Sequence, residues 1–429
     1  MVQKLFYLLW DESHLWGLML RRALEDMEIP FKLIGTSHIA ENILEKSPPA
    51  GLLIPGGWAK LKADNLGEDG LSRIREYIHS GGKYLGVCGG AGLGLQSPPK
   101  SSCLDLCSWT RKAMHQRLPN FSGHVRCQVS LPQWSSSRFD IYLPAWWPSQ
   151  FQSAADPGDK VQVVASYLEP GDDFWTADLR FKDLKNTDIQ KWEELYGINL
   201  DPELLEGEPC IIRGSLGKGE YILSYVHLET PESSQANALL RELLHSWLGS
   251  SLHLEEDIRV REWNLASHPV VWEDKVLYRT RQGLEDVIRL GREHFLLFWR
   301  LPWLLGWRRG IPGSQINFLY AMLCQVLSLG PDNRILTYWY KEKQEFERNA
   351  RIFLERVKNY LIRERLALSQ APSSPESSSD LNLQKERKEL FGSFPGYGGF
   401  YARLLRPLDE MLFMHASPEN SCKTPDARK

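Results

Sequence analysis

Cys88 has the sequence surroundings of an attacking thiol. It stands in the stretch Lys83-Tyr-Leu-Gly-Val-Cys-Gly-Gly-Ala-Gly-Leu. A hydrophobic strand that turns at once into a small-residue helix lifts one side chain above the sheet edge, and flanking glycines tolerate the strained turn. The positive end of the following helix would favour the thiolate. The sequence therefore predicts that Cys88 is a nucleophile, or the relic of one.

His227 and Glu229 supply the groups that such a thiol needs. They stand in His227-Leu-Glu229, directly after a β-rich run. A histidine can take the thiol proton if a carboxylate accepts its other ring N–H and so holds it in one tautomer. We expect Cys88, His227 and Glu229 to form a triad, with a strand-end ion pair as the alternative for the last two.

Glycines and tryptophans supply two further candidate groups. Pro55-Gly56-Gly57 closes an apolar run, and its backbone N–H groups, with the amide of Gly89, would bind the oxyanion of a tetrahedral intermediate. A simple turn is the alternative for Gly56 and Gly57. Trp146 and Trp147, with Trp134 and Phe151, would wall a substrate pocket beside Cys88 or, equally, belong to the core.

The elements that position these residues alternate in type. Apolar β-rich runs at residues 4–10, 31–34, 51–55 and 84–87 are separated by helical patterns at 14–27 and 70–80, the second stopped by Gly81-Gly82. Such alternation is typical of parallel strands joined by crossover helices. Further β-rich runs follow at 125–131, 139–143 and 161–168, and residues 210–226 read as a hairpin turning through Gly217-Lys-Gly219.

The rest of the chain is predicted to be mainly helical. Thr230-Pro-Glu is an N-cap candidate for a helix that runs to about residue 248, and the first domain is expected to span residues 1–250. We expect a helical region at 251–368, a disordered linker at 369–380, a short helical segment at 381–414 and a disordered tail at 415–429. The apolar segment 295–307 is interpreted as a core helix or partner interface, or else as a helix on an anionic membrane surface.

Composition narrows the class of protein. The chain has 429 residues, 42% of them hydrophobic and 24% charged, and a formal net charge of −3. These values fit a globular protein and argue against nucleic acid as a partner. The first residues lack the pattern of a secretory signal, and the seven cysteines are too scattered for a disulfide scaffold. The sequence contains no long uninterrupted apolar run, so we expect no transmembrane segment. We expect a cytoplasmic protein with reduced thiols.

The motifs together resemble a known superfamily. Pro-Gly-Gly, Gly-Val-Cys-Gly-Gly, Gly-Lys-Gly-Glu-Tyr-Ile-Leu-Ser and His-x-Glu resemble class I glutamine amidotransferase-like domains. The stretch 74–88 looks most like the domain at the N-terminus of some biotin-protein ligases and in free-standing bacterial proteins. The resemblance covers about residues 1–250. It implies a flavodoxin-like α/β fold with a mainly parallel central sheet, beside the helical C-terminal region.

The sequence also departs from that pattern. Amidotransferases that use glutamine usually carry Cys-x-Gly-x-Gln, and here Gly92 stands where that glutamine would be. There is no biotinyl-adenylate loop and no Walker phosphate loop, so we expect neither biotin ligation nor ATP hydrolysis. Cys103, Cys107, His115, His124 and Cys127 are spaced too irregularly to favour zinc. We expect no metal and no cofactor.

The leading hypothesis is therefore a glutamine amidotransferase-like protein that hydrolyses or transfers a small-molecule amide or acyl group, with the substrate unassigned. The alternative is a non-catalytic small-molecule-binding or scaffold protein, in which the helical C-terminal region binds a protein partner. The missing glutamine at Gly92 favours this alternative. His14 is interpreted as a surface or helix-capping residue, or as a substrate contact.

Overall fold

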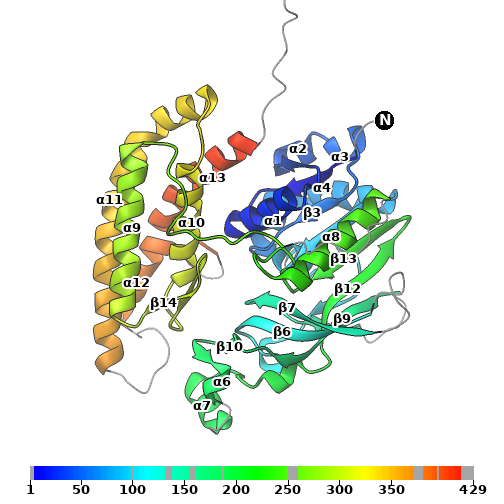
Figure 1. The fold of residues 1–429 in the computed structure, drawn as a ribbon, viewed down its shortest axis with the longest axis horizontal. Helices are drawn as coiled ribbons and strands as arrows, with labels where there is room; N and C mark the ends of the chain where they lie inside the picture. Colours follow the sequence, from blue (N-terminus) through cyan, green and yellow to red (C-terminus); the bar gives the residue numbers. More distant parts are fainter. Residues whose placement is uncertain are drawn as a thin grey trace, which may run out of the picture.

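The structure, a computed structural model, describes residues 4–98, 101–130, 138–154, 160–184, 188–249, 259–370, 380–393 and 396–416. An α/β part and a mainly helical part lie side by side, joined by the segment that leads from α8 to α9 (Figure 1). A mixed α/β fold of the predicted class is thereby confirmed. The predicted domain boundaries remain predictions.

Five parallel strands form the centre of the large sheet. They lie in the order β2-β1-β3-β4-β13, and every neighbouring pair is parallel. Their bounds are β1 (Phe6–Leu9), β2 (Phe31–Ile34), β3 (Leu52–Ile54), β4 (Lys83–Val87) and β13 (Gly219–Ser224). The carboxyl ends of parallel strands meet at one edge, so Cys88, Gly56 and Gly57 are brought to the same edge of the sheet.

Antiparallel strands extend the sheet beyond β13. β12 pairs with β13 as the predicted hairpin, and β9, β6 and β10 continue outward. The bounds are β6 (Phe121–Val129), β7 (Phe139–Trp146), β9 (Gln162–Pro170), β10 (Trp175–Thr176), β11 (Leu179–Arg180) and β12 (Pro209–Leu216). Two short strands, β5 (Thr110–Arg111) and β8 (Phe151–Gln152), pair separately, and α6 (Phe181–Leu184) and α7 (Ile189–Tyr196) follow β11.

Helices cover both faces of the parallel strands. The apolar side chains of α1 (His14–Asp26) and α8 (Ser234–Leu248) belong to one core, which continues into the helical part. Those of α2 (Thr36–Ala40), α3 (Ile43–Lys46), α4 (Ala59–His79) and α5 (Gly89–Gly94) belong to the other. α4 begins well before the predicted helix because it continues through a kink at Gly67.

The second part contains five helices among the described residues. α9 (Lys275–Glu293) lies beside α11 (Asn333–Gln370), and α10 (Gly313–Leu327), α12 (Leu381–Phe391) and α13 (Gly399–Ala416) pack around them (Figure 1). Two residues expected in the linker, 369 and 370, end α11, and Asp380 caps α12 through a bond from the N–H of Asn382. The rest of the predicted linker and most of the predicted tail lie outside the described residues.

The interpretation of residues 295–307 as a helix is wrong. They form a β-hairpin, β14 (Leu297–Leu301) and β15 (Leu304–Trp307), with Pro302 in the turn. A proline in the middle of the run disfavours a continuous helix, and the strand pairing satisfies the backbone instead. None of the described helices is long and apolar enough to span a membrane.

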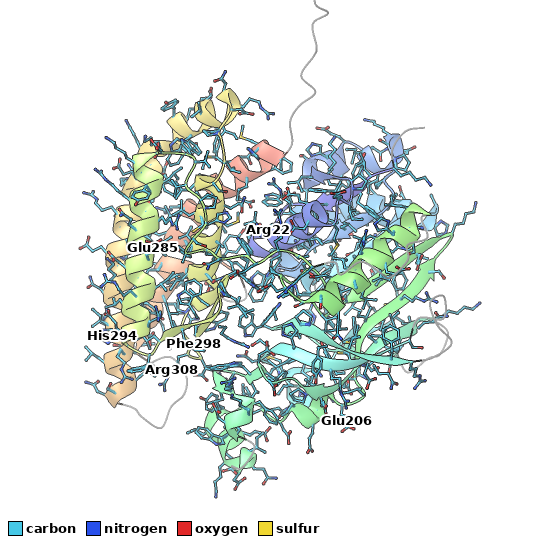
Figure 2. The ribbon with its side chains drawn as sticks, in the orientation of Figure 1. Arg22, Glu206, Glu285, His294, Phe298 and Arg308 are labelled. Atoms are coloured by element: carbon cyan, nitrogen blue, oxygen red, sulfur yellow. The ribbon has the colours of Figure 1, made fainter. Side chains whose placement is uncertain are left out.

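Side chains fill the junction between the two parts. Arg22 of α1 lies over the ring of Trp263, whose indole stacks near Trp303 of the β14–β15 turn. Figure 2 shows Arg22 near this junction and Phe298 on the hairpin. Phe298 stacks on Trp175 of β10, with ring centroids 4.9 Å apart. The helical part therefore packs directly on the α/β part.

Candidate active site

Cys88 stands at a strained turn between β4 and α5. Its backbone has φ 48° and ψ −99°, in a region that side chains other than glycine rarely adopt. Its N–H donates to the carbonyl of Ser224 at 2.7 Å, and its side chain is half-buried. Strain of this kind persists where surrounding structure enforces it, typically at functional sites.

The neighbouring glycines are required by close backbone contacts. A Cβ added to Gly86 would lie 2.4 Å from the carbonyl oxygen of Gly90, and one added to Gly90 would lie 2.0 Å from that of Ile54. Real Cβ atoms do not approach oxygen so closely. The elbow sequence thus folds this way because only glycine lets α5 lie against β3 and β4.

His227 and Glu229 form a fully buried pair. The ring nitrogen Nδ1 of His227 lies 2.8 Å from Oε1 of Glu229, and both side chains have no exposed surface. Among the described residues, His227 Nε2 and Glu229 Oε2 have no hydrogen-bond partner of normal geometry. The carboxylate can therefore fix the imidazole through Nδ1 and leave Nε2 free for proton transfer.

The Cys88 thiol also acts on this imidazole. Burial, the largest influence, lowers the pKa of His227, but the charge of Glu229, its hydrogen bond and the adjacent Cys88 thiol outweigh burial and raise the pKa to about 10. The structure therefore brings Cys88, His227 and Glu229 together. The thiol and the imidazole ring interact, but no contact between them meets the geometry of an ordinary hydrogen bond.

Gly57 and Gly89, the predicted oxyanion pair, lie in backbone contact. A Cβ added to Gly89 would lie 2.0 Å from the carbonyl oxygen of Gly57, and Gly57 itself has φ +114°. Among the described residues, neither N–H donates to a backbone acceptor outside its own element. The structure therefore places the two predicted amides next to each other at the Cys88 elbow.

Gly56 makes room for Trp16. A Cβ added to Gly56 would lie 2.8 Å from Cγ of Trp16, and the Trp16 indole lies over the His227 ring at 4.5 Å between centroids. Phe318 of α10 packs edge-on against the same indole at 5.8 Å. The surface of Gly56 that was predicted to line a substrate pocket is thus covered by an aromatic ring, which the sequence did not single out.

The turn that carries His227 is held by buried polar groups. Trp146 Nε1 donates to Oγ1 of Thr230 at 2.9 Å, and this hydroxyl donates to the carbonyl of His227 at 2.8 Å. Asn237 donates to the carbonyls of Leu228 and Thr230 at 2.9 and 3.0 Å. Thr230 is therefore not the N-cap of α8; Ser233 takes that position because the chain makes this extra turn first.

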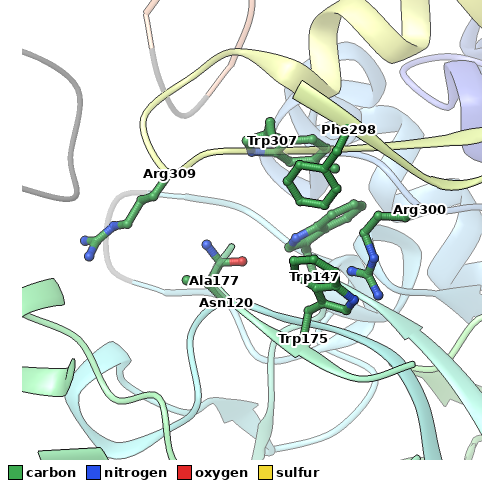
Figure 3. Close-up of a pocket in the computed structure, with 9 residues that line it drawn as sticks. Asn120, Trp147, Trp175, Ala177, Phe298, Arg300, Trp307 and Arg309 are labelled. Carbon is green, nitrogen blue, oxygen red and sulfur yellow. The ribbon is translucent and has the colours of Figure 1, made fainter. Parts of the chain in front are cut away.

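Trp146 is a core residue, 1% exposed, and Trp147 lines a different cavity. Figure 3 shows that cavity, between the β14–β15 hairpin and the loops of the α/β part. Its lining includes Trp147, Trp175, Phe298 and Arg300 but none of the triad residues, and its volume of about 10 Å³ suits one water molecule. The prediction that both tryptophans wall a pocket beside Cys88 is therefore not reproduced. Trp134 lies outside the described residues.

A buried charged cluster lies at the end of β1. The Lys62 ammonium, with no exposed surface, donates to the carbonyl of Asp11 at 3.0 Å and to Oγ of Ser13 at 2.6 Å. Burial lowers the pKa of Lys62 to about 7, against the opposing charges of Glu12, Asp11, Asp409 and Cys88. Burial and the charges of Asp11 and Glu12 raise the pKa of Asp409, on α13. The interpretation of sequence alone identified neither Lys62 nor Asp409.

His14 belongs to the same cluster. Its side chain is 6% exposed, so the expected surface position is wrong, and Nε2 lies 3.3 Å from the hydroxyl of Tyr397. Tyr397 also donates to Glu12 at 2.7 Å. Burial and the charge of Lys62 lower the pKa of His14 to about 3, which keeps the ring neutral at physiological pH.

The residues weighed as zinc ligands have other contacts. His124 bonds Asp173 at 2.9 Å and Ser233 at 2.8 Å, and Cys127 lies 3.9 Å from the sulfur of Cys210. Among the described residues no three His, Cys, Asp or Glu side chains are grouped so that they could hold a metal ion.

Comparisons with known proteins agree with the sequence motifs. Residues 31–97 match the family model described as biotin-protein ligase, N terminal. No curated protein sequence is detectably similar to the chain.

Several solved structures share low similarity with the chain. A protein from Thermoplasma acidophilum assigned as part of a GMP synthase is 14% identical, with 58% of this chain and 94% of that one covered and a TM-score of 0.35. A glutamine amidotransferase from Methylobacillus flagellatus is 15% identical, with 59% and 98% covered and a TM-score of 0.31. A β-galactosidase from Bacillus circulans is 12% identical, with 58% of this chain but 31% of that chain covered and a TM-score of 0.34.

Residues 31–97, which include the Cys88 elbow, are thus similar to the family described as biotin-protein ligase, N terminal, and they lie in a mixed α/β fold.

Proposed function

We propose that this protein hydrolyses or transfers an acyl group from a small-molecule amide or ester through a Cys88-His227-Glu229 triad. The observation that carries the proposal is the buried His227–Glu229 bond of 2.8 Å beside the strained Cys88 elbow, whose thiol interacts with the His227 ring. A strand-end ion pair needs neither the elbow nor a thiol that acts on the imidazole.

Each group has a role in the proposed reaction. His227 holds the thiol proton at Nε2 as an imidazolium, so Cys88 Sγ attacks the substrate carbonyl as the thiolate, and the N–H groups of Gly57 and Gly89 hold the oxyanion. The protonated imidazole, stabilised by Glu229, then donates its proton to the leaving group. Water or another acceptor attacks the resulting thioester, with His227 as base, and releases the acyl group and the thiol.

The test uses p-nitrophenyl acetate as an activated acyl donor. Attack by Cys88 releases p-nitrophenolate and leaves an acetyl thioester on the sulfur, which peptide mapping by mass spectrometry locates. We expect acetyl-Cys88 in the wild type and no acetyl thioester in Cys88→Ser. In His227→Gln we expect Cys88 to be acetylated at least about tenfold more slowly than in the wild type. Equal acetylation of the same peptide in wild type and Cys88→Ser would refute the mechanism.

One observation favours the alternative of a binding protein. Trp16 lies over the His227 ring and Phe318 lies against Trp16, so the imidazole is covered from the side of α10. A binding protein predicts that p-nitrophenyl acetate reacts with Cys88 at the rate of a free cysteine and that His227→Gln leaves this rate unchanged.

A further inference from the structure

We propose that Arg111, Arg117, Tyr225 and Ser149 form a carboxylate-binding subsite beside Cys88, so that the substrate is an amide or ester that carries a free carboxylate. This inference rests on the proposed function, because it names the chemical class that the same site accepts. Four observations carry it.

Arg111 occupies the space left open by Gly92. A Cβ added to Gly92 would lie 3.1 Å from Nη2 of Arg111 and 3.4 Å from Cβ of Ala59. Gly92 lies one helical turn after the nucleophile position, since its N–H donates to the carbonyl of Cys88 at 2.9 Å. A glutamine at position 92 would have to displace the guanidinium, so Gly92 and Arg111 are best understood together.

The Arg111 side chain is not committed elsewhere. It is exposed, and it makes no ion pair or side-chain hydrogen bond with another part of the described chain. Its backbone is nevertheless fixed, because β5 pairs with β8 and aligns Arg111 with Phe151. Phe151 in turn packs against the ring of Tyr225, with centroids 4.2 Å apart. A fixed backbone with a free planar guanidinium suits bidentate recognition of a carboxylate.

Tyr225 places a buried hydroxyl next to the elbow. It follows Ser224, whose carbonyl accepts the N–H of Cys88, and its side chain is 1% exposed. Its hydroxyl interacts with the Ser149 side chain, but it has no hydrogen-bond partner of normal geometry among the described residues. Leaving such a group unsatisfied is costly, and an incoming carboxylate oxygen would satisfy it.

The charges around this hydroxyl link it to both arginines and to the thiol. Burial raises the pKa of Tyr225 to about 12, the charge of Arg111 lowers it, Cys88 raises it, and a side-chain hydrogen bond with Ser149 and the charge of Arg117 lower it. Arg117 Nε and Ser149 Oγ also lack partners of normal geometry within the described part of the chain. The Tyr225 hydroxyl is therefore influenced by both guanidinium groups, by Ser149 and by the Cys88 thiol.

The positive charge of the two arginines and the planar shape of the guanidinium group favour a carboxylate as the bound anion. A carboxylate on the substrate can accept from Arg111 at the exposed side and from Tyr225 at the buried side, while its acyl carbon meets Cys88. The two positive charges have no carboxylate partner in the described structure at this point. A neutral amide would leave them unpaired.

The first experiment compares two alkylating reagents that differ in charge. Thiolate sulfur displaces iodide from iodoacetate, which carries a carboxylate, or from neutral iodoacetamide. We measure the alkylation rate of Cys88 with each, by peptide mapping of the full chain, in wild type and Arg111→Gln. The exposed Arg348→Gln on α11 is the matched control.

We expect Arg111→Gln to lower the iodoacetate-to-iodoacetamide rate ratio about tenfold, the loss typical of one charge-assisted contact. Arg348→Gln should leave the ratio unchanged, and Arg111→Lys should restore part of it. An unchanged ratio in Arg111→Gln, with Cys88 still reacting rapidly, would overturn the subsite but not the triad. Slow alkylation of Cys88 by both reagents, at the rate of a free thiol, would instead count against the proposed function.

A second measurement does not depend on the reactivity of Cys88. Binding of glutarate to Cys88→Ser is followed by calorimetry, with inorganic phosphate as the competing anion. Glutarate should bind, and Arg111→Gln in the Cys88→Ser background should weaken it about tenfold. Absence of glutarate binding, or phosphate binding that is tighter and equally dependent on Arg111, would overturn the assignment to a carboxylate.

Discussion

The indole of Trp16 lies over the imidazole of His227, with ring centroids 4.5 Å apart. Trp16 belongs to α1 of the α/β part, and Phe318 on α10 meets its edge at 5.8 Å. The helical part therefore contacts Trp16, the residue that packs over the ring of His227, the candidate general base. This contact gives the C-terminal region a direct physical connection with the site.

A double-mutant cycle tests this connection. We expect Trp16→Leu and Phe318→Leu each to lower the free energy of unfolding, and their coupling energy to be about 0.5–1.5 kcal/mol, the range for an edge-on aromatic pair. Urea unfolding of wild type, both single variants and the double variant measures it. Additive effects would show that the two rings do not stabilise each other.

Glu229 is expected to set the titration of His227. Its charge and hydrogen bond, together with the Cys88 thiol, raise the pKa of His227 to about 10 against burial, which lowers it. Glu229→Gln removes the charge, so the titration midpoint of the His227 ring should fall by more than one pH unit. NMR of the imidazole Cε1–H measures the midpoint, and His115→Gln, at an exposed position, identifies an unrelated signal.

The same shift has a consequence for stability. The folded-state pKa of His227 lies above the unfolded value of 6.5. The contribution of protonated His227 to the free energy of unfolding is therefore fully present below pH 6.5 and is lost as pH rises through about 10. The difference in free energy of unfolding between wild type and Glu229→Gln should therefore shrink from pH 6.5 to pH 10. A difference that stays constant over this range would show that His227 does not titrate as inferred.

Gly90 is expected to be indispensable to the elbow. Its added Cβ would lie 2.0 Å from the carbonyl oxygen of Ile54, a backbone atom that cannot rotate away. Gly90→Ala should lower the free energy of unfolding by more than about 3 kcal/mol or prevent folding. Gly330→Ala, where a Cβ meets nothing within 4 Å, should change it by less than about 0.5 kcal/mol. Thermal unfolding measured by circular dichroism compares the two.

Local patterns explain what the sequence predicted well. The glycines around Cys88, the continuous apolar character of 51–55 and the turn at 217–219 each determine structure over a few residues. The apolar run at 295–307 was misread because its length suits a buried helix or two short strands, and hydrophobicity alone does not separate them.

Contacts between distant residues explain what sequence reasoning missed. Trp16 over His227 joins positions 211 residues apart in the chain, and Asp409 comes near Asp11 and Glu12 because α13 packs against β2, the neighbour of β1. Arg111 gave no signal because a lone arginine in a short polar stretch is ordinary. Its position against Gly92 becomes apparent only from the packing.

Lys62 provides the last prediction, because its buried ammonium opposes folding at low pH. Its folded-state pKa is about 7, below the unfolded value of 10.5, chiefly because burial disfavours the charge. The folded state therefore binds fewer protons than the unfolded state between pH 7 and 10.5, so this residue makes stability rise with pH over that window.

Lys62→Met removes this dependence, although it also removes the bonds to Asp11 and Ser13. The free energy of unfolding of the variant minus that of the wild type should be largest at pH 6 and should fall progressively as pH rises toward 10. Urea unfolding of both proteins from pH 6 to pH 10 gives the difference at each pH, in which the contribution of His227 cancels as long as the variant leaves that residue unperturbed. A relative stability of Lys62→Met that stays constant from pH 6 to pH 10 would mean that Asp11, Glu12 and Asp409 hold the ammonium charged, and the buried cluster would then be an ion network.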